Sequence, residues 1–181
     1  MPADLSADLT MESLLEQYPG ARRALFSAFH IGGCQSCAYQ LDETLEEVCR
    51  NHEIEIEAAL DCLIKSREHD AAMLISPEEL KALIDQDASF TLLDTRTREE
   101  FEAITLPSAK LMTQDLQNAL FAKKDELGTV VLLDHQGRSV LDHCAWFRGH
   151  GLVETYGVDG GIDRYAQEID QSIPRYRLEL D

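Results

Sequence analysis

The stretch VVLLDHQGRS, Val130 to Ser139, decides the fold of the second half of the chain. Its first four residues are apolar, which is typical of a buried strand, and the glycine-containing segment Asp134 to Ser139 ends that strand. A helical pattern, Asp142 to His150, follows. A buried strand that passes through such a loop into a helix directs backbone N–H groups toward one point. The stretch therefore predicts an anion-binding loop of the kind that often carries the chemistry of α/β proteins.

The sequence on both sides of this stretch alternates short apolar runs with helical patterns. Ser76-Pro77-Glu78-Glu79 has the features of a capped helix start, with a serine N-cap and proline at the first helical position. Phe90 to Leu93 and Val153 to Val158 predict two further strands. Strands that alternate with helices indicate an α/β fold, in which helices cover both faces of a parallel sheet.

The amino-terminal third of the chain has helical patterns only. Thr10 and Thr44 are expected to be N-caps, and Glu46 and Glu47 lie where the dipole of the second of these helices favours acidic residues. The polar composition of residues 67–73 favours a linker. We therefore expect a small all-helical domain at residues 1–66, a linker at 67–73 and the α/β domain at 74–181.

The composition restricts the classes of partner. The chain has 34 Asp and Glu against 16 Lys and Arg, a formal net charge of −18, which disfavours nucleic acid and anionic membrane surfaces as partners. The first residues lack the pattern of a signal peptide, and no apolar run reaches the roughly 18 residues of a membrane span. We therefore expect a cytoplasmic protein. Its five cysteines, an odd number, then suggest thiol chemistry, metal ligands or core residues rather than disulfides.

The cysteines of the helical region allow three interpretations. Cys34 and Cys37 form a C-x-x-C pair, which can open and close a disulfide reversibly. Together with Cys49 and Cys62 they could instead hold zinc or an iron–sulfur cluster. The third interpretation is that these thiols are structural. The expected cofactor is none, with a metal or cluster as the alternative.

Two further groups of residues in the α/β region are candidates for chemistry. Asp94, Arg96 and Glu100 could form a charged site, although an Asp–Arg pair at a strand end more often holds a loop in place. Cys144 is the only thiol of this region, but its helical position places it on the packed face, as a core residue rather than a nucleophile.

Five segments in the same order resemble the rhodanese domain: ISPEEL (75–80), LLDTRTREEF (92–101), VVLLDHQGRS (130–139), LDHCAWFRGHGL (141–152) and VDGGIDRY (158–165). The tail IDQSIPRY (169–176) is similar to endings found in a bacterial branch of that family. The resemblance implies the rhodanese fold and a loop in which a cysteine takes sulfur from a sulfane donor as a persulfide. The loop residues are Asp134, His135, Gln136, Gly137, Arg138 and Ser139, and an alignment without gaps places Asp134 at the position of that cysteine.

A carboxylate cannot carry a sulfane sulfur as a persulfide. We hypothesise that Asp134 fills its own loop, its carboxylate accepting the N–H bonds that would otherwise hold a persulfide or an oxyanion. The alternative is neutral drift after a loss of catalysis.

The segments LLEQYPGARRALFSAFHIGGCQSC (14–37) and DETLEEVCRNHEIEIEAAL (42–60) resemble a hybrid-cluster-protein-associated redox disulfide domain. This second resemblance implies a redox-active Cys34–Cys37 dithiol.

Two functions remain open. The first is a catalytically inactive rhodanese-like protein with a dithiol domain, acting as a sulfur- or redox-responsive binding or regulatory module. The second is a sulfurtransferase or thiol–disulfide oxidoreductase in which Cys34 and Cys37 replace the missing loop cysteine. Either function implies a protein partner or a thiol or sulfane-sulfur carrier, and a homo-oligomer is possible.

Overall fold

The computed structural model describes residues 5–32, 39–86, 88–124 and 126–177. The chain divides into two compact units, Met1–Ala72 and Met73–Asp181. The described helices of the first unit are α1 (Met11–Gln17), α2 (Ala21–Phe29), α3 (Leu45–Asn51) and α4 (Ile56–Ala71). None of the helices in the described ranges has the length and apolar character needed to cross a lipid bilayer.

The expected N-caps of the first unit are present. The Thr10 side chain accepts a hydrogen bond from the Ser13 amide at the start of α1. Thr44 and Glu47 form a reciprocal capping box at the start of α3. The helices enclose one apolar core, whose largest fully buried side chains are Met11, Leu14, Leu25, Ile31, Leu45 and Leu63.

The segment that the sequence suggested as a linker is helical up to Ala71, as the last turns of α4. One of its polar residues, Asp70, faces the interior of this unit. The Tyr18 hydroxyl lies 2.8 Å from both Ser66 Oγ and Asp70 Oδ2, and Arg23 donates to Asp70 Oδ1 at 2.5 Å. Because Asp70 is only 3% exposed, its polarity reflects a buried hydrogen-bonding role and not a solvated linker.

The second unit has a five-stranded parallel sheet in the order β1-β5-β4-β2-β3. Its strands are β1 (Leu74–Ile75), β2 (Phe90–Asp94), β3 (Lys110–Leu111), β4 (Thr129–Leu133) and β5 (Thr155–Val158). Its helices are α5 (Pro77–Asp85), α6 (Arg98–Ala103), α7 (Gln114–Ala122), α8 (Val140–Gly149) and α9 (Gly161–Glu168). Ser76 and Glu79 form the expected capping box of α5.

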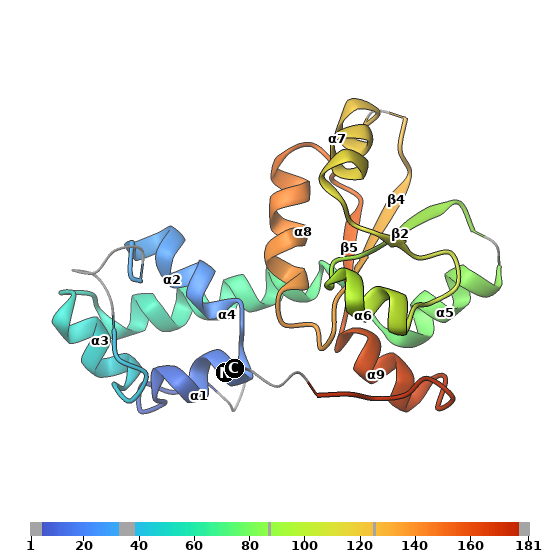
Figure 1. Ribbon diagram of the computed structural model, residues 1–181. Coiled ribbons are helices and arrows are strands. Elements are labelled where there is room, and N and C mark those ends of the chain that lie inside the picture. The colour runs from blue at the N-terminus through green and yellow to red at the C-terminus, as the bar shows by residue number, and fades with distance from the viewer. Residues whose placement is uncertain (1–4, 33–38, 87, 125, 178–181) are drawn as a thin grey trace. The chain divides into compact units, whose positions relative to one another are not determined.

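Alternate residues of β4 face opposite sides of the sheet. Val130 and Leu132 belong to a core shared with α7 and α8, whereas Val131 and Leu133 belong to one shared with α5 and α9. These helices lie on the two sides of the sheet in Figure 1. The predicted α/β class, with a parallel sheet covered on both faces and helices in the amino-terminal unit, is confirmed.

Some element boundaries differ from the sequence-based expectations. Helix α8 begins at Val140, two residues before the expected start at Asp142. The final strand begins at Thr155 rather than Val153. Strands β1 and β3 contain two residues each, which is too short for a period-two pattern to reveal them.

Strands β2 and β4 are neighbours in the sheet. The connections that follow them lead toward opposite edges of the sheet. After β2 the chain continues to β3 on one side, and after β4 it continues to β5 on the other. Such a reversal is a topological switch point, and in open α/β sheets ligands bind outside the carboxyl ends of the strands that flank it. The residues that follow Asp94 and Leu133 are therefore the candidates for a ligand-binding site.

We predict that Asp70→Ala destabilises the helical unit, because it leaves the Tyr18 hydroxyl without its carboxylate partner in a buried position. The expected loss is about 2 kcal/mol in the free energy of unfolding, measured by urea denaturation. The matched control on the same helix is Asp61→Ala, which removes an ion pair with Lys65 on the exposed face. Equal unfolding free energies for the two variants would contradict the role assigned to Asp70.

Candidate functional site

The Asp134 carboxylate occupies the centre of the loop that follows β4. Its Oδ2 accepts hydrogen bonds from the amides of Ser139 at 2.9 Å and Val140 at 3.0 Å, and from Ser139 Oγ at 3.1 Å. Its Oδ1 accepts a hydrogen bond from the Gly137 amide. Asp134 is 5% exposed. The loop therefore contains a cradle of converging N–H groups, and the anion in it is a side chain of the same loop.

The start of α8 explains why a carboxylate is stable in this position. The first amides of a helix have no acceptor within the helix, and the N-cap side chain usually supplies one. Here the N-cap Ser139 makes no side-chain cap bond to the helix. Asp134 accepts instead from the amide of the N-cap Ser139 and from that of Val140, the first residue of α8, and its negative charge is favoured by the helix dipole.

The backbone of the loop packs directly against the turn that precedes α9. The Ile162 amide donates to the Asp134 carbonyl and the Asp163 amide to the His135 carbonyl, both at 3.0 Å. Gly161 has a φ of +60°, and a Cβ at this position would lie 2.5 Å from the Asp134 carbonyl oxygen. The turn therefore requires glycine and holds the loop through backbone contacts alone.

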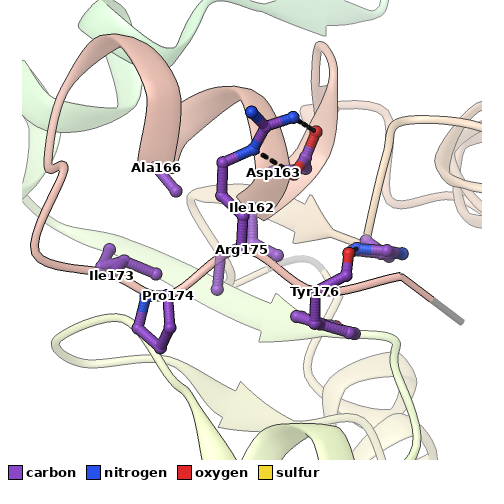
Figure 2. A pocket seen from close by; sticks show the side chains of 8 residues that line it. Ile162, Asp163, Ala166, Ile173, Pro174, Arg175 and Tyr176 are labelled. Atoms are coloured by element: carbon purple, nitrogen blue, oxygen red, sulfur yellow. Dashed lines mark hydrogen bonds and ion pairs between the residues drawn. The ribbon is translucent and has the colours of Figure 1, made fainter.

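A segment near the carboxyl terminus, residues 173–177, lies against His135 of the loop and Asp163 of α9, and we call it the strap. The Tyr176 ring stacks on the His135 ring with centroids 4.1 Å apart and an interplanar angle of 13°. His135 Nε2 lies 3.1 Å from the Tyr176 carbonyl oxygen, which can only accept, so the proton is assigned to Nε2. Figure 2 shows the side chains of Arg175 and Tyr176 and the ion pair between Arg175 and Asp163, whose Nε–Oδ1 distance is 2.7 Å.

The same tyrosine reaches the residues that follow β2. Arg96 Nη1 donates to the Tyr176 hydroxyl at 2.9 Å, and that hydroxyl donates to Glu100 Oε1 at 2.6 Å. Burial, together with the hydrogen bond to Glu100, raises the pKa of Tyr176 to about 12. The phenol is therefore neutral at physiological pH and acts as both donor and acceptor.

Asp94 and Arg96 form a buried ion pair at the end of β2, with side chains 0% and 1% exposed. Arg96 contacts both carboxylate oxygens of Asp94 and also donates to the Ile104 carbonyl at 2.7 Å. This geometry favours the interpretation that the pair holds its loop in place, and it adds a second role, the binding of Tyr176.

The remaining loop residues face solvent. Gln136, Arg138 and Ser139 are exposed. A cavity of about 350 Å³ lies between the loop and the strap, lined by Gln136, Asp163, Arg175, Tyr176 and Arg177.

The described thiols are packed in or against the core of their own unit. Cys144 is fully buried in the core beneath α8, which agrees with its interpretation as a core residue. Cys49 is buried in the helical unit, and Cys62 Sγ lies 3.8 Å from the Ala24 carbonyl oxygen. Burial raises the pKa of both thiols. Cys34 and Cys37 lie outside the described residues.

The metal interpretation involves Cys34 and Cys37, which lie outside the part of the chain that the structure describes. Within it, no group of three or more His, Cys, Asp or Glu side chains is arranged to hold a metal ion.

Sequence reasoning missed the strap contacts of Tyr176 and Arg175. The available signal is the tail IDQSIPRY, whose similarity to endings in the family says nothing of its contacts. Nothing in its local pattern indicates that Tyr176 contacts Arg96, 80 positions earlier in the chain.

Comparison with known proteins agrees with this architecture. The family model of the rhodanese-like domain matches residues 76–168. The rhodanese-like/PpiC domain-containing protein 12, chloroplastic, of Arabidopsis thaliana is 32% identical over 114 residues, which cover 56% of this chain and 36% of that protein. This chain thus spans little more than a third of the plant protein's length.

A thiosulfate sulfurtransferase GlpE of Pseudomonas savastanoi pv. phaseolicola is 29% identical over 89 residues, covering 49% of this chain and 82% of that enzyme. Among solved structures, a rhodanese-like domain protein from Staphylococcus aureus is 19% identical with a TM-score of 0.45, and the match covers 57% of this chain and 98% of that one. From the family match at residues 76–168, which is half of its length, this chain belongs to the rhodanese-like domain family.

Proposed function

We propose that this protein is a catalytically inactive rhodanese-like module, joined to a dithiol helical domain, that acts as a sulfur- or redox-responsive binding or regulatory protein. Its partner is a protein or a thiol or sulfane-sulfur carrier. We propose a cytoplasmic location, where a reducing environment keeps cysteines available as thiols.

The observation that carries this proposal is the hydrogen bonding of Asp134. Sulfur transfer of the rhodanese type needs a thiolate that attacks a sulfane donor and keeps the sulfur as a persulfide. A carboxylate has no sulfur to form that bond. The Asp134 carboxylate also accepts hydrogen bonds from the amides of Ser139 and Val140, which would otherwise stabilise a bound anion.

The same contacts argue against a loop that has merely drifted. Asp134 makes four hydrogen bonds from a buried position and supplies the cap that Ser139 does not. A carboxylate in this arrangement stabilises the loop, so the substitution is accommodated by the structure around it. These hydrogen bonds support the proposal that the loop keeps its structure as part of a binding module.

The responsive part of the proposal rests on Cys34 and Cys37 and on the resemblance of their surrounding sequence to a redox disulfide domain. Full burial of Cys49 and partial burial of Cys62 raise the pKa of these two thiols, which lowers their thiolate fraction at neutral pH. We therefore assign reversible thiol chemistry to Cys34 and Cys37. An enzyme that uses this pair in place of the loop cysteine is the alternative.

We predict that the wild-type protein does not convert thiosulfate and cyanide to thiocyanate. The variant Asp134→Cys is expected to gain the mass of one sulfur atom at residue 134 after thiosulfate treatment. The thiolate, beside the amide donors of the loop, attacks the sulfane sulfur, and the S–S bond of thiosulfate breaks to release sulfite and leave a persulfide. Peptide mass spectrometry measures this gain, and Asp134→Ser is the control. Wild-type turnover that persists in Cys144→Ser would contradict the inactive assignment and favour the enzyme.

We also predict that mild oxidation, or treatment with a sulfane-sulfur donor, modifies Cys34 and Cys37 before the buried Cys49 and Cys144. Differential alkylation followed by peptide mass spectrometry gives the order of modification. The variant Cys37→Ser is expected to abolish the reversible disulfide while leaving Cys49 unmodified. If Cys34 and Cys37 stay unmodified under conditions that modify the buried thiols, the responsive role is wrong.

A further inference from the structure

The crevice at the switch point is filled by a side chain of the same chain. Tyr176 contacts Arg96 and Glu100, which follow β2, and His135, which follows β4. The carboxyl ends of these two neighbouring strands are where an open α/β sheet binds its ligands. The strap therefore lies where a ligand of an open α/β sheet would bind.

The surroundings of Tyr176 have the composition of a binding site. The imidazole of His135 provides a flat face, parallel to the phenol ring. Arg96 provides a donor and Glu100 an acceptor for the hydroxyl, and the Arg96 side chain is 1% exposed and fixed by Asp94. A fixed donor and acceptor beside an aromatic face discriminate a phenol from an unsubstituted ring, because the polar groups would otherwise lose their partner.

The strap is attached mainly through side chains. Arg175 pairs with Asp163 on α9, and Tyr176 makes the contacts described above. Pro174 and Arg175 are exposed, and the cavity of about 350 Å³ separates part of the strap from Gln136. The strap belongs to no strand of the sheet, so its release would break no strand pairing.

We propose that this crevice is a peptide-binding site for an arginine- and tyrosine-containing segment of a partner protein, and that the strap is its intramolecular competitor. This inference rests on the proposed binding function and names the site through which it acts. The net charge of −18 and the acceptor Asp163 favour a basic segment, as in the strap itself. Binding of the partner and displacement of the strap are then one event.

The tether determines how strongly the strap competes. A segment joined to its site by a short linker has an effective concentration in the millimolar range. A partner segment with the same contacts would therefore bind the wild-type protein much more weakly than it binds a protein whose strap is disabled. The free energy needed to release the strap therefore lowers the affinity of the protein for the partner segment.

The test uses the full-length chain and a fluorescent peptide of residues 170–177, DQSIPRYR. The acceptor is the double variant Arg175→Ala/Tyr176→Ala, which retains the chain but removes the side chains that hold the strap. We expect the peptide to bind the double variant at least tenfold more tightly than the wild type, measured by fluorescence anisotropy. A peptide with alanine at the tyrosine position is the control and is expected to lose at least tenfold in affinity for the double variant.

Equal affinity of the peptide for the two proteins would overturn the inference. So would equal binding of the two peptides, or no binding to a folded double variant at millimolar peptide. If circular dichroism shows that the double variant is unfolded, Tyr176→Phe replaces it as acceptor, since it keeps the stacked ring and loses only the hydroxyl contacts. Tighter peptide binding than in the wild type is again expected, and unchanged binding contradicts the inference. Thiocyanate formation by the wild type would instead overturn the inactive assignment and leave the peptide result standing.

Discussion

The hydrogen bonds from the amides of Ser139 and Val140, where α8 begins, to the Asp134 carboxylate are the constraint on which the site depends. Helix starts need acceptors, and the N-cap Ser139 does not provide one to the helix. Asp134, the first residue after β4, provides the acceptor for the amides of Ser139 and Val140, which lie five and six positions later in the chain. This contact joins the end of the central strand to the start of the helix that covers it, so the loop between them is short, curled and closed around a charge of its own.

Two further contacts hold this closed loop from outside. The Gly160–Gly161 turn meets its backbone, where a side chain at Gly161 would collide with the Asp134 carbonyl. The strap covers His135 with the ring of Tyr176 and connects it to Arg96 at the end of β2. The chain itself thus supplies both the anion in the loop, which is the Asp134 carboxylate, and the group in the crevice, which is the Tyr176 side chain. A rhodanese-like fold arranged in this way is suited to recognition by displacement of its own segments.

The parts of this site that sequence predicted are those with local causes. The apolar run of β4, the capped start of α5 at Ser76 and the glycine-containing loop after β4 all follow from neighbouring residues. The contact of Tyr176 with Arg96 spans 80 positions and has no periodic signal. The polar residues at the end of α4 suggested a linker because composition alone cannot distinguish a solvated Asp70 from one that is bonded to Tyr18 in the interior.

Amide hydrogen exchange is the most direct measurement of the central claim, that the Asp134 carboxylate holds the start of α8. Exchange at Gly137, Ser139 and Val140, followed by NMR, is compared between the wild type and Asp134→Ala. The account predicts that protection of these three amides falls at least tenfold in the variant, while Val131 and Leu132 in the centre of β4 keep theirs. Unchanged protection of Ser139 and Val140 in a folded Asp134→Ala protein would contradict the account.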